Sequence, residues 1–281
     1  MNQTFDFRRW WMLVTLHWVE NRKRYGLGLL AIAGLLIAWF SFLLTVDKFS
    51  GLDLGYQFSA YFVGLYFIGC LLSGTIFSEL GDKRQGIGYL SLPASHLEKL
   101  LCALLFSIVL FFMAFTLVYY IVDIPFVHAA NNLMGERNRI SADLSSVPYT
   151  TPVYNIFMAT GAPMPEQDDH VFLTSYFAFQ SVFLLGSIYF TRSAFIKTTV
   201  AVLLFMLVYV AFVSEGVGRQ LPPGWFIKDL FQWQRASSLV GQGQWIRLPF
   251  AIECALKILL RYGIPVLFWV IAFFRLREKE V

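Results

Sequence analysis

The chain is poor in charged residues, and long stretches of it contain none. Asp, Glu, Lys and Arg make up 14% of its 281 residues, whereas a soluble domain contains about 25%. Four runs of roughly 20 residues carry no charge: 25–46, 57–78, 100–122 and 171–191. A helix of that length crosses about 30 Å of hydrocarbon. This composition excludes a soluble domain and predicts a membrane protein.

The motifs of common enzyme classes are also missing. The sequence has no G-x-x-x-x-G-K-[ST] loop, which excludes ATP hydrolysis by the chain itself. It has neither an H-E-x-x-H metal motif nor a G-x-S-x-G elbow with catalytic partners. The uncharged runs lack the mid-membrane charges of an ion-coupled transporter, and we interpret Asp123, at the end of the third run, as a boundary residue. We expect no enzyme activity and no catalytic residue.

Cysteine and histidine do not form a cofactor site. Cys70, Cys102 and Cys254 lie in or beside apolar runs without CxxC spacing, and we interpret them as packing residues. His128 and His170 have no neighbouring ligands at metal-binding spacing. We expect this chain to bind no metal and no cofactor.

The charges that are present divide the chain into two sides. Two shorter or interrupted runs, 198–214 and 255–275, bring the predicted crossings to six. With both ends cytoplasmic, the short cytoplasmic segments hold 13 Lys and Arg residues against seven Asp and Glu residues, in agreement with the positive-inside rule. The longer segments 123–170 and 215–254 then lie outside. The bases border the membrane instead of forming one patch, so we expect no nucleic-acid partner. The predicted fold is an all-α polytopic membrane protein.

The first 24 residues predict an amphipathic helix on the membrane surface. Four apolar residues follow spacings of four, three and four, which place them on one helical face: Phe7, Trp11, Val14 and Trp18. Neighbouring basic residues suit lipid headgroups. We expect residues 1–24 to contact membrane lipids at the cytoplasmic interface and residues 25–281 to form the transmembrane domain. Whether the helix only anchors the chain or also has another role stays open.

Small residues recur along the second run. They are Gly64, Gly69, Ser73 and Gly74. Small side chains in a membrane helix let a neighbouring helix come close. We interpret this pattern as a packing surface.

The loop between the second and third crossings combines a helix start with an apolar cluster. Ser95 and Glu98 have the S-x-x-E spacing of a capping box, which satisfies backbone N–H groups at the start of a helix. The box explains the LPASHLEK stretch simply as the start of the third crossing. It does not explain the cluster before it, formed by Ile87, Tyr89, Leu90 and Leu92. An apolar patch that faces the cytosol usually contacts another protein.

Aromatic residues in the second outer segment predict a further helix. Trp225, Phe226, Leu230 and Trp233 could line one helical face. Aromatic residues are enriched at membrane–water interfaces. We expect an interfacial or re-entrant helix on the outer leaflet.

Three charged residues interrupt the last crossing. Glu253, Lys257 and Arg261 are spaced at i, i+4 and i+8, so they stack on one face of a helix. The two bases can snorkel to the outer interface, helped by the glutamate. Alternatively, this outer polar stripe faces a substrate or a partner. The sequence leaves both interpretations open.

These features together resemble the permease subunits of ABC-2 type transporters, the exporter-class membrane components of bacterial ABC transporters. The resemblance covers most of the chain. It rests on the amphipathic helix, on six crossings with both ends inside, and on the loop GIGYLSLPASHLEK at 86–99. Members of this family often carry a Leu-Pro-x-Ser stretch in that loop. The outer segment 123–170 departs from the family, whose members usually have a short connection there.

The resemblance implies a partner and a contact loop. In this family the loop between the second and third crossings docks on a separate ATPase subunit, which binds and hydrolyses ATP. Two permeases, either copies or paralogues, act with two ATPases. Carried over to this chain, the loop would contact the ATPase through apolar anchors among residues 87–92 and a charged rim among residues 79–84. Its residues are Glu79, Asp82, Lys83, Arg84, Ile87, Tyr89, Leu90 and Leu92.

The resemblance therefore implies an ATP-driven permease of the bacterial inner membrane that works by alternating access. Sparse intramembrane charge and aromatic-rich crossings favour export of a hydrophobic or amphipathic substrate. The competing hypothesis is a non-transporting membrane scaffold or assembly protein that holds a partner through its long outer segment. The missing mid-membrane carboxylates disfavour an ion-coupled transporter.

Overall fold

Six helices of the described chain are long and apolar enough to cross a membrane, which confirms the predicted multi-pass helical architecture. The computed structural model describes residues 5–46, 52–77, 94–140, 151–156, 169–190, 193–212, 225–229, 232–235, 245–247 and 249–278. Four of the helices are uninterrupted: α1 (Phe7–Val46), α2 (Leu54–Thr75), α6 (Asp169–Tyr189) and α7 (Ala194–Ala211).

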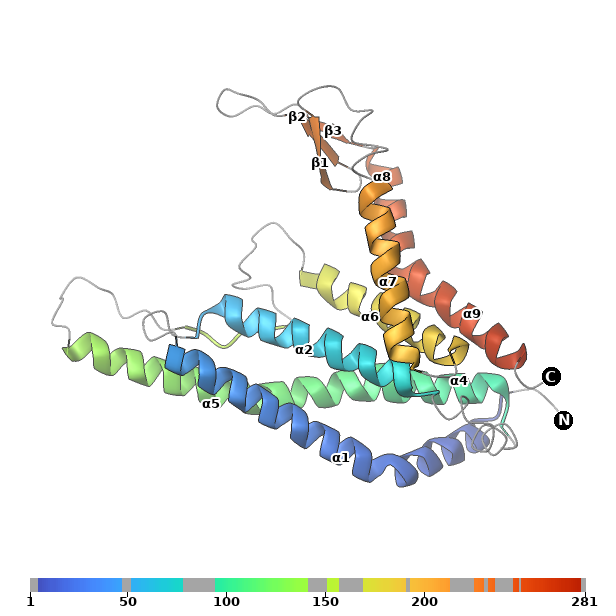
Figure 1. The fold of residues 1–281 in the computed structure, drawn as a ribbon, viewed down its shortest axis with the longest axis horizontal. Helices are drawn as coiled ribbons and strands as arrows, with labels where there is room; N and C mark the ends of the chain where they lie inside the picture. Colours follow the sequence, from blue (N-terminus) through green and yellow to red (C-terminus); the bar gives the residue numbers. More distant parts are fainter. Residues whose placement is uncertain are drawn as a thin grey trace.

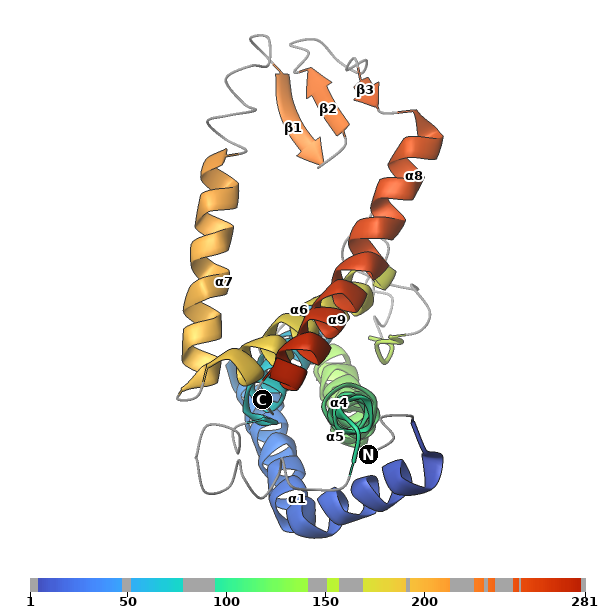
Figure 2. The same cartoon turned by 90° about the vertical axis from the view of Figure 1, so that its right-hand side faces the viewer.

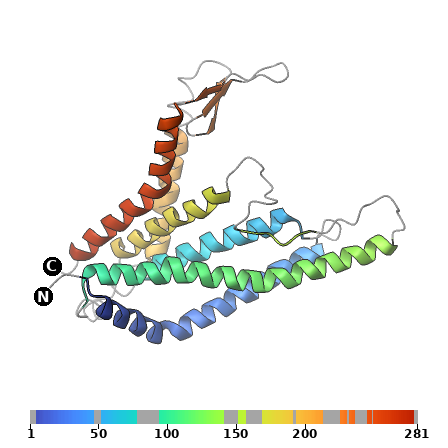
Figure 3. The same cartoon turned by 180° about the vertical axis from the view of Figure 1, so that it is seen from behind.

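The third and sixth helices each contain a π-helical turn. The third consists of α4 (His96–Leu104), the turn η2 (Leu105–Leu110) and α5 (Phe111–Ile140). The sixth consists of α8 (Phe250–Ile258), the turn η5 (Leu259–Gly263) and α9 (Ile264–Glu278). The third helix continues well past the predicted end of its crossing at residue 122. Part of the predicted outer segment 123–170 is thus helical, and Figure 3 shows α5 extending beyond α2 and α6.

Most of the helices form one packed group, and two helical segments extend out of it. α1 packs on α5, α2 on α6, and α6 on α9. α7 and α8 rise from this group and diverge (Figures 1 and 2). α1 and α4 begin at the end of the molecule where α9 ends. We call this the Glu98 end, after the residue described below.

The amphipathic N-terminal segment and the first crossing form one continuous helix. α1 runs without interruption through Tyr25, where we predicted the boundary between these two parts, and it bends in its first half (Figures 1 and 2). The apolar face that we predicted for the first part of this helix is partly buried and partly exposed. Val14 is buried with Leu13, whereas Phe7, Trp11 and Trp18 are exposed. Therefore one part of the face packs on the protein and another stays available to lipid.

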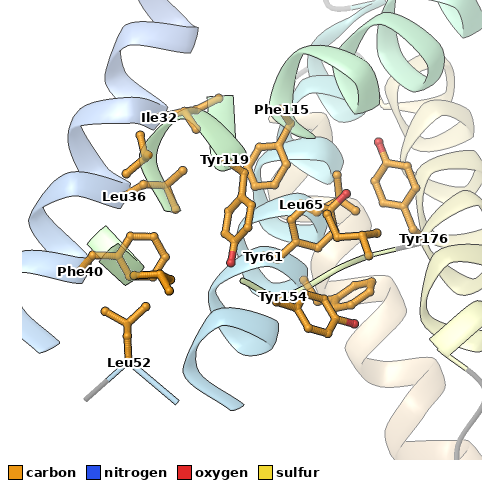
Figure 4. Packing of buried hydrophobic residues seen from close by; sticks show 14 of the residues in the cluster. Ile32, Leu36, Phe40, Leu52, Tyr61, Leu65, Phe115, Tyr119, Tyr154 and Tyr176 are labelled. Carbon is orange, nitrogen blue, oxygen red and sulfur yellow. The ribbon is translucent and has the colours of Figure 1, made fainter. Parts of the chain in front are cut away.

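Aromatic side chains from several helices fill the core. Tyr119 of α5 stands between Phe40 of α1 and Tyr61 of α2, with ring centroids 6.2 and 5.0 Å away in edge-to-face geometry (Figure 4). Such geometry is favourable for aromatic pairs. The hydroxyl of Tyr61 is hydrogen-bonded to that of Thr116 at 2.9 Å, so its polar end is satisfied. This core joins α1, α2 and α5.

The small residues of α2 lie at close helix contacts, as predicted. A Cβ on Gly64 would lie 2.9 Å from the Phe115 ring, and one on Gly74 would lie 3.3 Å from the Phe195 backbone. A Cβ on Gly69 would collide with Gln180 of α6 and lie 3.0 Å from Tyr176. Glycine is therefore what allows α2 to approach its neighbours.

The close approach of α2 to α6 at Gly69 leads to a prediction about stability. Gly69→Ala should destabilise the fold by about 1–3 kcal/mol, because the added methyl overpacks the α2–α6 contact. The measurement is the thermal unfolding midpoint in detergent. Gly34→Ala on α1 is the matched control, since nothing lies within 4 Å of its added Cβ. A midpoint for Gly69→Ala equal to that of Gly34→Ala would contradict the packing.

The prediction of a helix over residues 225–233 is wrong. Trp225 and Phe226 belong to strand β1 (Trp225–Asp229), and Trp233 belongs to β2 (Gln232–Arg235). These strands and β3 (Trp245–Arg247) form an antiparallel sheet in the order β1-β2-β3. Trp225 pairs with Arg235. Aromatic residues favour strands once backbone partners are available, and the following segment supplies them. Figure 2 shows the sheet between the ends of α7 and α8.

Candidate functional site

The capping box predicted at the start of the third crossing is present. Glu98 donates its backbone N–H to Ser95 Oγ at 3.2 Å, and Ser95 donates its backbone N–H to Glu98 Oε2 at 2.8 Å. Each residue thus satisfies a backbone donor of the other. α4 consequently begins at His96, immediately after the loop for which we predicted an ATPase contact.

Glu98 also holds the start of α1. Its second oxygen, Oε1, accepts from the backbone N–H of Asp6 at 2.8 Å and from Arg9 Nη2 at 3.1 Å. The Glu98 side chain is fully buried, and the side chain of Arg9 is 34% exposed. We call these four residues, Asp6, Arg9, Ser95 and Glu98, the Glu98 node. The node connects the two helices that flank the Glu98 end.

Apolar contacts support the node. Leu13 and Val14 of α1 pack in one cluster with Cys102 of α4 and Phe106 of η2. Tyr25 stacks on Phe106, with ring centroids 5.8 Å apart and planes at 10°. The first half of α1 is therefore fixed to the start of the third helix. A displacement of the start of the third helix would therefore also move the first half of α1.

The predicted ATPase-coupling loop itself lies outside the described residues. It comprises Glu79, Asp82, Lys83, Arg84, Ile87, Tyr89, Leu90 and Leu92, and its role stays a prediction. The structure describes the chain on both sides of it. α2 ends at Thr75 with Phe77 buried, and residue 94 begins the approach to the Glu98 node.

The predicted outer polar stripe is divided between two helical segments. Glu253 and Lys257 belong to α8, and their side chains are outside the described part of the structure, whereas Arg261 lies in η5. Arg261 donates from Nε to Thr174 Oγ1 of α6 at 2.7 Å. Its Nη2 is buried and has no hydrogen-bond partner among the described residues. Arg261 therefore contacts another helix, which its spacing could not reveal.

A second polar cluster lies at the opposite end, where residues 151–156 form an extended strap over α2 and α5. Gln57 of α2 is fully buried and holds the strap. Its Nε2 donates to the carbonyls of Leu52 and Pro152, at 3.0 and 3.2 Å, and its Oε1 accepts from the N–H of Tyr154 at 2.7 Å. The Tyr119 hydroxyl donates to the Gln57 carbonyl at 2.9 Å. One side chain thus joins the strap to the start of α2.

α5 anchors both ends of the strap. Asn131 donates from Nδ2 to the Thr151 carbonyl at 3.0 Å and accepts at Oδ1 from the Thr151 N–H at 3.0 Å. At the other end, the N–H of Ile156 donates to the Tyr120 hydroxyl at 3.2 Å. Backbone groups of an irregular segment need such partners when they are buried. The strap is therefore an integral part of the fold.

Asp123, which we interpreted as a boundary residue of the third crossing, lies inside α5 and is buried in the protein. Its side chain is 0% exposed. Within the described part of the chain, neither of its carboxyl oxygens has a hydrogen-bond partner. Sequence reasoning also missed Gln57 and Asn131, whose strap contacts carry no local signal.

An open apolar groove of about 870 Å³ runs along the third helix. It is lined from Ile108 in η2 to Ile124 in α5, with Phe177 of α6 on the other side. At 1.5 Å per residue, that part of the helix is about 24 Å long. The groove can accommodate an acyl chain or another extended apolar group.

Comparisons of the chain with protein-family models, with curated proteins and with solved structures found no match. Among the described residues, no group of three or more His, Cys, Asp or Glu side chains could hold a metal ion. The Glu98 node, the strap and the groove are therefore the features on which a functional assignment rests.

Proposed function

We propose that this chain is the membrane-spanning permease subunit of an ATP-driven ABC exporter. ATP would be bound and hydrolysed by a separate ATPase subunit, and the chain itself would bind no cofactor. A second copy or a paralogue would complete the pair of permeases. The proposal places the chain in the bacterial inner membrane, with the Glu98 end in the cytoplasm and the strap outside.

The Glu98 node is the observation that carries this proposal. A permease driven by a partner must transmit the partner's movement into its own helices. The predicted contact loop ends directly at Ser95, and Glu98 ties that point both to α1 and to the third helix. The third helix continues to the strap at the other end. A push on the loop can therefore reach two membrane helices and, through α5, the opposite end of the bundle.

The apolar groove supports a hydrophobic or amphipathic substrate. Its wall is almost free of polar groups from Ile108 to Ile124. A substrate that enters from the lipid would meet a surface of similar polarity there. We propose alternating access for its export, with the strap closing the outer end between cycles.

The test replaces apolar anchors of the predicted contact loop. An Ile87→Asp, Leu90→Asp chain should lose at least tenfold in affinity for an ABC ATPase subunit that co-purifies with the wild-type chain, because a central apolar anchor contributes about 2 kcal/mol or more. Affinity is measured with the two purified subunits in detergent. Leu133→Asp is the control, since Leu133 is an exposed leucine on α5 at the opposite end. Unchanged affinity of the loop variant would refute the coupling assignment.

The strap favours the competing function of a non-transporting scaffold, because it gives the chain an ordered surface at the end opposite to Glu98. A scaffold that binds its partner there would keep that partner after Ile87→Asp and Leu90→Asp. It would also fail to stimulate ATP hydrolysis by an ABC ATPase subunit. The same variants therefore separate the two functions.

A further inference from the structure

The last helix carries an arginine inside its apolar span. Arg261 lies in the π-helical turn η5, within the segment Leu259–Glu278 that is long and apolar enough to cross a membrane. A charged side chain in such a segment is costly and usually marks the path of a substrate or an ion. π-helical turns inside helices are also frequent at functional sites. Arg261 is therefore a candidate binding residue.

Two contacts between the last helix and α6 indicate how deep Arg261 lies. The guanidinium of Arg275 lies 4.7 Å from the centroid of the Tyr189 ring at the Glu98 end. Further along, Arg261 Nε donates to Thr174 Oγ1 at 2.7 Å. The two contacts are about 21 Å apart along the last helix. Because the predicted crossing ends at Arg275 and the hydrocarbon core is about 30 Å thick, Arg261 lies within that core.

The contact with Thr174 leaves donors of the Arg261 guanidinium available. Its Nη2 is buried and has no hydrogen-bond partner among the described residues. Glu253, the acidic member of the predicted stripe, is eight positions away, about 12 Å along a helix axis, whereas helix neighbours meet three or four positions apart. Lys257 is four positions away and is a second base. The Arg261 site is therefore suited to an anion.

Arg261 reaches α6 beside the apolar groove. Thr174 and Phe177 are three positions apart on α6, so their Cβ atoms lie about 5–6 Å from each other. Phe177 lines the groove together with Phe112 of the third helix. The Phe112 ring also contacts the ring of Tyr176, with centroids 6.0 Å apart, so α6 meets the third helix at this level. The cationic group therefore lies close to a surface that suits an acyl chain.

These two neighbouring features select one class of ligand. A guanidinium presents a planar fork of donors that matches the oxygens of a phosphate group. The groove accommodates the apolar chain of the same molecule. The headgroups of the surrounding lipids lie outside the hydrocarbon core, whereas Arg261 lies within it. A phosphate on Arg261 would therefore belong to a lipid that has left the headgroup layer.

We propose that Arg261 binds the phosphate group of a lipid whose acyl chain lies in the groove along the third helix. Thr174 orients the guanidinium through Nε, and Nη2 donates to the phosphate. The inference rests on the proposed export function in one respect, because it makes a phosphate-bearing lipid the substrate class. Binding itself needs no ATPase, so it can be measured on this chain alone.

The first test removes the charge. Binding of a fluorescent lysophosphatidic acid to the purified chain in detergent is followed by anisotropy. Arg261→Gln should weaken binding at least tenfold, because the phosphate loses charge-assisted hydrogen bonds. Arg275→Gln is the matched control, since it removes the same charge from the same helix at the Glu98 end, where Arg275 pairs with Glu278. Arg261→Met replaces Arg261→Gln if that variant does not fold.

Equal affinity of the wild-type chain and Arg261→Gln would overturn the proposal. That result is expected if the partner of Nη2 is a carboxylate of the chain itself. A loss of affinity in Arg275→Gln as large as that in Arg261→Gln would also overturn it, because the effect would then follow the net charge of the helix and not this site.

The second test separates the phosphate from the acyl chain. A monoacylglycerol with the same chain lacks only the phosphate, so it should bind the wild-type chain at least tenfold more weakly than lysophosphatidic acid. An excess of inorganic phosphate should not displace the lipid, because it lacks the chain. Equal binding of the two lipids would refute the phosphate site. Displacement by inorganic phosphate would show a site for free anions and would refute the lipid assignment.

The third test obstructs the groove. Leu117→Trp adds volume at a groove-lining position and should weaken binding of lysophosphatidic acid. Leu203→Trp on α7 is the control, because Leu203 is about as exposed as Leu117, at 58% and 60%. Unchanged binding in Leu117→Trp would overturn the placement of the acyl chain. Failure of the ATPase-affinity test would refute export and leave these binding results unaltered, so the two proposals fail separately.

Discussion

Replacement of Glu98 by alanine is expected to destabilise the protein by about 3 kcal/mol, a large part of the stability of an ordinary domain. Half of the capping box survives the change, because the backbone N–H of residue 98 still binds the Ser95 hydroxyl. The backbone N–H groups of Asp6 and Ser95 lose the oxygens that they bind, and a hydrogen bond to a charged group contributes about 1.5–3 kcal/mol. We discount the contribution of Arg9, because its side chain is 34% exposed.

The measurement is the thermal unfolding midpoint in detergent, together with proteolysis of the N-terminal segment. Detachment of the first part of α1 should make that segment cleavable before the rest of the protein unfolds. Glu278→Gln is the matched control, because its ion pair with Arg275 is exposed and local. A surface pair of this kind contributes at most about 1 kcal/mol. Equal midpoints for the two variants would show that the Glu98 node does not hold α1.

Replacement of Gln57 by alanine is expected to release the strap. The N–H of Tyr154 and the carbonyls of Leu52 and Pro152 lose their side-chain partners. Each would cost about 1–3 kcal/mol if it stayed buried and unpaired, so exposure of the strap to water becomes the favourable alternative. Hydrogen exchange of residues 151–156 should accelerate at least 100-fold, which corresponds to about 2.8 kcal/mol of lost protection.

The control for Gln57 lies on the same helix. Ser59 is exposed, and its hydroxyl donates to the Tyr56 carbonyl within α2. Ser59→Ala should leave exchange in the strap unchanged. If Gln57→Ala also leaves it unchanged, the strap is held by Asn131 and Tyr120 alone, and Gln57 is not its anchor.

Local patterns predicted those parts of the fold whose partners are close in sequence. The four uncharged runs predicted membrane helices, because their length and composition suit a bilayer wherever their neighbours lie. The Ser95–Glu98 box was equally predictable, since its two residues are three positions apart and satisfy each other's backbone. The small residues of α2 predicted close packing for a similar reason. A small side chain lets a neighbouring helix come close, whichever helix that is.

Local patterns failed where distant segments decide the structure. The aromatic residues from Trp225 to Trp233 suit one face of a helix, but pairing with the following strands makes them part of a sheet. The burial of Asp123 carried no local signal, because its position in the sequence is only the end of an uncharged run, whereas in space it lies on a buried face of α5. Glu98 and Asp6 are 92 residues apart, and Gln57 and Tyr154 are 97 apart.

The amino-acid sequence by itself determined that this is a multi-pass helical membrane protein and where its third helix begins. Hydrophobic length and helix capping act over a few residues or one crossing, so they can be read along the chain. The tertiary structure alone decided that Glu98 ties α1 to α4, that Gln57 holds the strap, and that Asp123 is buried. These contacts depend on which helices meet, because a buried polar group takes its partner from whatever segment packs against it.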